Sequence, residues 1–171
     1  MAANDNHCTD HAEPAAIQIE QLPFAAQFAI WAARAWVTAL KLDQPFSAVS
    51  HGTFERFDLD EAENDLDALF SIVAHSASRQ IDIRCLKCSH VSPDEMLFQQ
   101  AVAAVQGEDS LAAYEALRAW LPPAAARTGL RALTSFANRL SQRELRLSKP
   151  LSSAPRSHAH MRADLPSVAL H

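Results

Sequence analysis

The residues with the most evident chemistry are two cysteines in the motif Cys85-Leu-Lys-Cys88, which His90 follows two residues later. Two cysteines at this spacing can both reach one metal ion, each sulfur at about 2.3 Å from it. The same spacing allows two thiols to form a disulfide and to reopen it. A third interpretation is that the cysteines only pack at the edge of the core, because cysteine is a small and mostly buried residue. The sequence leaves these three interpretations open.

In the metal interpretation, Cys85, Cys88 and His90 would be ligands of a zinc ion. A closed zinc site needs four ligands, and the chain has no second C-x-x-C motif. The missing ligands could come from residues 7–11 (His-Cys-Thr-Asp-His) or from residues 158–160 (His-Ala-His). Zinc is the one cofactor that the sequence suggests.

In the redox interpretation, Cys85 would be the attacking thiolate of a thiol–disulfide oxidoreductase, Cys88 the resolving thiol and His90 a candidate base. The positive charge of Lys87, between the two cysteines, favours the thiolate form. We expect the motif to lie in a loop that joins an extended link to a helix.

The motif loosely resembles that of an all-helical peroxidase-reductase family, in which a histidine follows a C-x-x-C pair. That family carries its cysteines on a helix and places the histidine four residues after the second one. Here His90 comes two residues after Cys88, and Pro93 ends any helix from upstream, so the activity of that family is not transferred. Ser89 also separates the second cysteine from His90, which excludes covalent haem attachment through C-x-x-C-H.

The second candidate site is an arginine-rich face on a helix that we predict to begin at Pro123. Residues 1–117 carry a net charge of −12 and residues 118–171 a net charge of +7. At 100° per residue, five arginines fall within an arc of about 160°, and they are Arg127, Arg131, Arg139, Arg143 and Arg146. Such a face could bind nucleic-acid phosphates, an anionic membrane surface or a protein partner. We expect an ordinary solvated face, partly neutralised by the acidic part of the chain, because the whole molecule is acidic.

The fingerprints of most enzyme classes are missing. With three glycines in 171 residues, the chain has no phosphate-binding glycine loop and no nucleophile elbow. It also has no H-E-x-x-H motif and no E-x-x-H pair of the di-iron kind.

The elements that must position these residues are helices. Hydrophobic residues make up 49% of the chain, enough for the core of one domain. The pattern predicts an all-α bundle of about five helices, at residues 24–42, 58–78, 92–106, 110–120 and 123–141. Residues 46–57 are ambiguous, with a short helix broken near Gly52. We expect Asp58 to cap the second helix, Ser92 and Glu95 to form a capping box for the third, and Gly107 to end that helix in a left-handed conformation.

We predict a helical domain over residues 21–147, a flexible N-terminal tail over residues 1–20 and a disordered C-terminal tail over residues 148–171. The helix at 24–42 is apolar on most sides, so we expect it to be central. Its polar residues, Arg34 among them, form one narrow strip. Because it carries charges and much alanine, it is unsuited to membrane insertion. Without a signal peptide pattern, we expect a cytoplasmic protein.

For function, we expect a small regulatory or adaptor protein that acts through contacts with another protein or through self-association. The arginines at 127, 131, 139 and 143 are the candidate partner-binding residues. The alternative is a thiol–disulfide oxidoreductase that uses Cys85 and Cys88. A nucleic-acid-binding regulator is a minor alternative.

Overall fold

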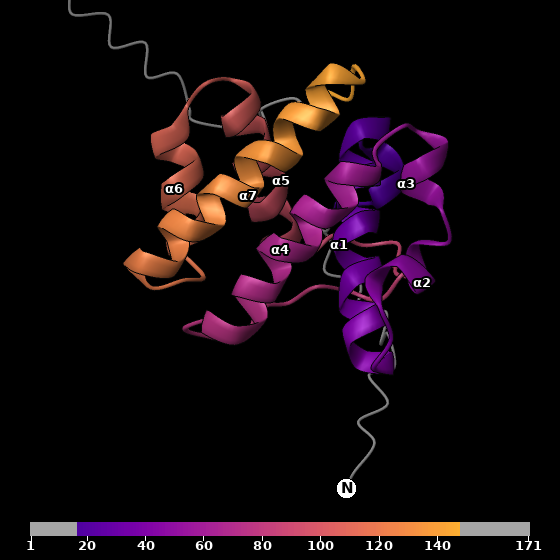
Figure 1. The fold of residues 1–171 in the computed structure, drawn as a ribbon, viewed down its shortest axis with the longest axis horizontal. Helices are drawn as coiled ribbons and strands as arrows, with labels where there is room; N and C mark the ends of the chain where they lie inside the picture. Colours follow the sequence, from indigo (N-terminus) through magenta and orange to yellow (C-terminus); the bar gives the residue numbers. More distant parts are fainter. Residues whose placement is uncertain (1–16, 148–171) are drawn as a thin grey trace, which may run out of the picture.

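Helices account for all the regular secondary structure in residues 17–147, the part of the chain that the computed structural model describes (Figure 1). The predicted tails at residues 1–16 and 148–171 lie outside the described residues. A 3-10 turn, η1 (Ile19–Gln21), precedes seven α-helices. These are α1 (Phe24–Leu42), α2 (Phe46–Ser50), α3 (Thr53–Arg56), α4 (Asp60–Ser76), α5 (Pro93–Gln106), α6 (Ser110–Arg118) and α7 (Pro123–Gln142). The prediction of an all-α domain is confirmed: the five longer helices are the predicted ones, and the short α2 and α3 fill the ambiguous segment.

Local sequence signals explain where several helices begin. α1 follows Pro23, and α7 has Pro123 at its first position, where the missing amide hydrogen costs nothing. α5 begins with the predicted capping box: the Ser92 hydroxyl accepts from the Glu95 amide at 3.1 Å, and the Glu95 carboxylate accepts from the Ser92 amide at 2.9 Å.

Two predicted helix ends are wrong. The N-cap of α4 is Leu59 rather than Asp58, which instead takes a left-handed conformation with φ 52° and reverses the chain between α3 and α4. Gly107 is not left-handed, since its φ is −92°. Its amide still bonds to the carbonyls of Ala103 and Ala104 as part of the last helical turn, so the reversal falls one residue later, at Glu108 with φ 60°.

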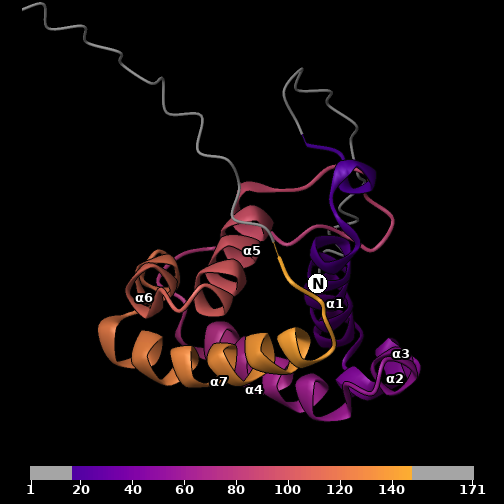
Figure 2. The same cartoon turned by 90° about the horizontal axis from the view of Figure 1, so that it is seen from above.

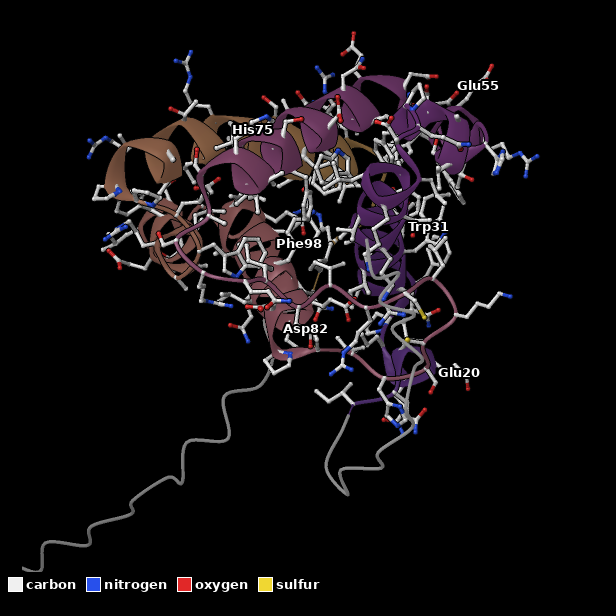
Figure 3. The ribbon with its side chains drawn as sticks, turned by 90° about the horizontal axis from the view of Figure 1, so that it is seen from below. Glu20, Trp31, Glu55, His75, Asp82 and Phe98 are labelled. Carbon is white, nitrogen blue, oxygen red and sulfur yellow. The ribbon has the colours of Figure 1, made fainter. Side chains whose placement is uncertain are left out.

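The helices pack in two groups around one core (Figure 2). α4 and α7 lie side by side and form one side of the molecule, and α5, α6 and α1 lie across them. α2 and α3 lie along one side of α1, with α2 near the C-terminal end of α1 and α3 near the beginning of α4. Phe98 of α5, labelled in Figure 3, lies amid the helices and its ring packs against those of Phe70 (α4) and Phe136 (α7).

α1 is buried on most of its sides, as expected for a central helix, and small alanines allow its neighbours to approach closely. Among the described residues, no helix is both long and apolar enough to cross a membrane.

Candidate functional site: a braced cysteine loop

The cysteine pair lies on the loop 77–92, which joins α4 to α5. Its two sulfur atoms are 2.7 Å apart. A turn brings them together, since the amide of Cys88 donates to the carbonyl of Cys85 at 3.1 Å. Cys85 is exposed and Cys88 is half-buried. The first cysteine of the motif is therefore the more accessible of the two.

The sulfur separation can be compared with the distance that each chemistry proposed for the pair requires. Two thiolates on one tetrahedral zinc ion, each bonded at about 2.3 Å, would lie about 3.7 Å apart. A disulfide bond is about 2.05 Å long. The 2.7 Å separation is nearer to the disulfide value, but Cys88 is itself in a disulfide that does not include Cys85, so a bond between these two sulfurs could form only by exchange.

A buried arginine of α1 holds the second half of the loop. Arg34 is 1% exposed, and its guanidinium donates to both carboxylate oxygens of Glu95, at 2.7 and 2.9 Å. The same group donates to the carbonyl of Cys88 at 2.5 Å and to that of His90 at 2.8 Å. Burying an ion pair is costly unless the remaining donors and acceptors are also satisfied, and these contacts meet that condition.

Glu95 connects this arginine to the first half of the loop. Besides the guanidinium, its carboxylate accepts from the backbone amide of Arg84 at 2.9 Å and from that of Ser92 at 2.9 Å. Arg84 directly precedes the cysteine motif and Ser92 begins α5. One carboxylate, fully buried, therefore fixes the backbone on both sides of the pair.

The role of Arg34 was missed from the sequence, which places it only on the polar strip of an apolar helix. A signal was present, because an arginine on a helix buried on most sides needs an acidic partner. The capping box supplied the acid, but capping residues are ordinarily exposed, so the sequence does not indicate the pairing.

A second polar cluster fixes the start of the loop through Asp94. Its carboxylate accepts two hydrogen bonds from the Arg79 guanidinium, at 2.5 and 2.9 Å. It also accepts from the amide of Asp82 at 2.8 Å and from the indole of Trp120 at 3.0 Å. The hydrogen bonds from Arg79 are the largest cause of a pKa for Asp94 that is lowered from 3.8 to about 2, and desolvation opposes the shift.

The chain before α1 pairs with the last part of the loop. The amide of Ile19 donates to the carbonyl of Ser89 at 2.7 Å, and the amide of Val91 donates to that of Ile17 at 2.9 Å. Residues 17–20 belong to the predicted N-terminal tail, yet they form this bridge. The ring nitrogens of His90 lie 3.2 Å from the Ser89 hydroxyl and 3.4 Å from the Gln18 side-chain amide. Residues 17–21, like the labelled Glu20, thus lie on the same side of the molecule as the loop (Figure 3).

Zinc remains a prediction. Within residues 17–147, no three His, Cys, Asp or Glu side chains are grouped so that they could hold a metal ion. The other proposed ligands, which include Cys8 and the histidines at 7, 11, 158 and 160, lie outside the described residues.

The structure divides the arginine-rich face of α7 into two parts. Toward the end of the helix, Arg139 pairs with Glu61 and Asp65 of α4, the latter at 2.7 Å, and Arg143 donates to the carbonyl of Asp58 at 3.1 Å. The hydrogen bond that Arg139 donates to the Asp65 carboxylate is the largest cause of a raised pKa for Arg139. At the other end, Arg127 and Arg131 are exposed. Acidic residues before and within the first two turns of α4 thus neutralise one half of the face.

The two candidate sites are on opposite sides of the protein. Figure 2 shows that the loop 77–92 leaves the end of α4 and runs to the side of the molecule away from α4 and α7. In Figure 3, Asp82 on the loop and His75 on α4 mark the two sides. The cysteine pair and the arginine-rich face therefore cannot contact the same small ligand.

A pocket of about 310 Å³ lies between the end of α1, α2 and α4. Its walls combine Trp36 and Phe46 with the carboxylates of Glu63 and Asp67. Both carboxylates already have internal donors, since the Trp36 indole donates to Asp67 at 2.7 Å and the Ser50 hydroxyl donates to Glu63 at 2.5 Å. No pattern in the sequence indicates this pocket, because its residues come from three separate segments.

Comparisons of the chain with protein-family models, with curated proteins and with solved structures found no match.

Proposed function

We propose that the protein is a thiol–disulfide redox module, in which Cys85 and Cys88 exchange electrons with a disulfide of another molecule. The observation that supports this proposal best is that the sulfur of the exposed Cys85 lies 2.7 Å from that of Cys88, which is in a disulfide that does not include Cys85. A metal site would need further ligands, and residues 17–147 supply no such group.

The exposure of the two cysteines supports the role proposed for each of them. Starting from the form in which the disulfide of Cys88 has been reduced and both cysteines are thiols, the accessible thiolate of Cys85 attacks one sulfur of the partner disulfide. A mixed disulfide forms, and the other partner sulfur leaves as a thiolate, which takes up a proton. The thiolate of Cys88 then attacks the sulfur of Cys85 and releases the second partner thiol. Two electrons and two protons have moved from the pair to the partner, and the pair is left as a disulfide.

The regulatory role predicted from the sequence fits this chemistry. A redox module without the usual enzyme fingerprints can act by reporting the thiol–disulfide balance to a protein partner. The exposed Leu86 and Lys87, between the two cysteines, are the first side chains that such a partner would contact.

The test is to equilibrate the full chain with mixtures of reduced and oxidised glutathione, quench it with acid and measure its intact mass. We expect a loss of two hydrogens, and peptide mapping should place the disulfide between Cys85 and Cys88. Cys8→Ser is the matched control and should oxidise like the native chain. Cys88→Ser should stop at a mixed disulfide of Cys85 with glutathione, because the resolving thiol is missing.

Several results would contradict the proposal. One is a pair that stays reduced at every ratio of the two glutathione forms. Another is a zinc ion that co-purifies with the chain and is lost in both Cys85→Ser and Cys88→Ser. A disulfide of Cys88 with a cysteine other than Cys85 that persists at every glutathione ratio, so that no C-x-x-C bond forms, would also overturn it.

A further inference from the structure

We propose that the pocket between α1, α2 and α4 is a binding site for a small organic amine, a ligand that carries one ammonium group on an apolar body. The pocket lies outside the cysteine loop, and the inference does not depend on the proposed redox function. Its volume of about 310 Å³ is at the lower end of the range for small-molecule sites, so it suits a ligand of this size rather than a large cofactor.

Two carboxylates of α4 give the pocket its charge. Glu63 and Asp67 are four residues apart, so they lie one turn apart on the same side of the helix. Each accepts a hydrogen bond from a neutral group, which is the Ser50 hydroxyl for Glu63 and the Trp36 indole for Asp67. Within residues 17–147, neither carboxylate forms an ion pair with an arginine or a lysine. Their negative charges are therefore not balanced by a cationic side chain.

A second pair of carboxylates on the same helix shows the contrast. Glu61 and Asp65 are also four residues apart, but they face α7 and both pair with Arg139. Like charges at this spacing on a helix repel each other. In the described part of the chain, no arginine, lysine or histidine lines the pocket to offset the repulsion between Glu63 and Asp67. A bound cation would offset it, so these charges favour a positively charged ligand.

The aromatic walls of the pocket suit an organic cation. Trp36 and Phe46 are both buried, and ring contacts hold them in place: the Trp36 ring lies 5.5 Å from that of Phe70, and the Phe46 ring 5.7 Å from that of Phe54. Aromatic rings attract ammonium groups, and they also bury an apolar ligand body. Leu40, which lines the pocket and is exposed, adds apolar surface open to solvent. Because the walls are fixed before binding, little conformational freedom is lost when a ligand enters.

A bare metal cation fits this pocket less well. Calcium takes about six to eight oxygen ligands, whereas the part of the chain that the structure describes groups no three acidic, histidine or cysteine side chains for a metal ion. An ammonium group needs only a few hydrogen-bond acceptors, and the carboxylates supply them. The two carboxylates and the two aromatic walls therefore point to an amine.

The first experiment titrates the full chain with phenethylamine and follows the NMR signals of the tryptophan indole N–H groups. The Trp36 signal is identified by its loss in Trp36→Phe, and the buried Trp120, which donates to Asp94, is the internal reference. At about 0.15 M salt, which screens long-range attraction, we expect the Trp36 signal to move with a dissociation constant below about 1 mM. Phenethyl alcohol has the same ring and chain without the charge, and it should bind at least about tenfold more weakly.

The second experiment removes the two charges in the double variant Glu63→Gln, Asp67→Asn. The amide oxygens can still accept from Ser50 and Trp36, so the fold should be kept. We expect the dissociation constant for phenethylamine to rise at least about tenfold. The matched control is Glu61→Gln, Asp65→Asn, which makes the same two changes on the side of α4 that faces α7. It should change the constant less than about twofold, because the remaining net charge is the same but the pocket is intact.

Three results would overturn the inference. One is the absence of amine binding up to about 10 mM. Another is equal binding of the amine and the alcohol, which would make the site merely apolar. The third is equal weakening in both double variants, which would assign the effect to the net charge of the protein. If the first double variant does not fold, the comparison of amine with alcohol on the native chain still decides the question.

Discussion

Replacing Asp94 by asparagine should destabilise the protein at neutral pH and much less at pH 2. The Asp94 side chain is the shared acceptor for Arg79, Trp120 and the backbone of Asp82. A carboxyl group whose pKa falls from 3.8 in the unfolded chain to about 2 in the folded protein binds protons less well when folded. Its contribution to stability is therefore complete at neutral pH and is lost as the pH falls toward the folded pKa.

The size of the effect follows from the same values. The difference between the two pKa values, 3.8 and about 2, corresponds to about 2 kcal/mol of unfolding free energy at pH 7. By the same relation, about half of this contribution should already be lost at pH 3. The Arg79 side chain is 45% exposed, so solvent screening weakens its contribution to this free energy. Trp120 is 1% exposed, so the hydrogen bond that it donates to Asp94 is protected from water.

The measurement is urea unfolding followed by far-ultraviolet circular dichroism at pH 7, 3 and 2. Native protein and Asp94→Asn should differ by about 2 kcal/mol at pH 7 and by roughly half as much at pH 3. Asp82→Asn is the control: its side chain is 50% exposed and pairs only with the exposed Arg84, so it should change little. A difference that is the same at pH 2 as at pH 7 would show that the charge on Asp94 does not stabilise this cluster.

Two further predictions concern α7. Gly129→Ala should raise the unfolding free energy, measured by urea denaturation, by up to about 1 kcal/mol, because alanine is favoured over glycine in a helix interior. The added methyl group would lie 3.4 to 3.7 Å from three leucine side chains, which is ordinary contact. A loss of stability would mean that these leucines cannot accommodate the methyl group. Arg139→Ala should lower the melting temperature more than Arg131→Ala does, because Arg139 pairs with Glu61 and Asp65 while Arg131 is exposed. The difference between the two variants in melting temperature should become smaller in high salt, which screens ion pairs. Equal losses of melting temperature in low salt would contradict the division of the arginine-rich face.

The helices were predictable because their signals are local. Proline before α1, the capping box of α5 and the apolar stripe of α4 each depend on residues within one or two turns. The two errors, at Asp58 and Gly107, concern chain reversals. Aspartate and glycine are both ordinary residues for a left-handed position. Which residue reverses the chain, however, depends on where the next helix must begin. That position is set by packing.

The cysteine pair was visible in the sequence, whereas its surroundings were not. Spacing alone identified Cys85 and Cys88 as a unit, and it left metal binding, redox chemistry and packing open. The groups that hold the loop come from α1, α5 and the chain after α6, as Arg34, Glu95 and Trp120 show. Contacts between residues 61 positions apart, such as Arg34 and Glu95, leave no periodic signal in one sequence.

The first turn of α5 has two roles that cannot be separated. Ser92 and Glu95 cap the helix, and Asp94 lies between them; the same acidic residues hold the cysteine loop on both sides of its turn. An ordinary capping box needs only a hydrogen-bond acceptor at each position, so glutamine would serve in place of glutamate. Here the negative charge of Glu95 is also required, because it balances the buried guanidinium that contacts Cys88. Helix initiation and the geometry of the cysteine pair therefore depend on one set of hydrogen bonds, which makes the loop rigid although its central residues are exposed.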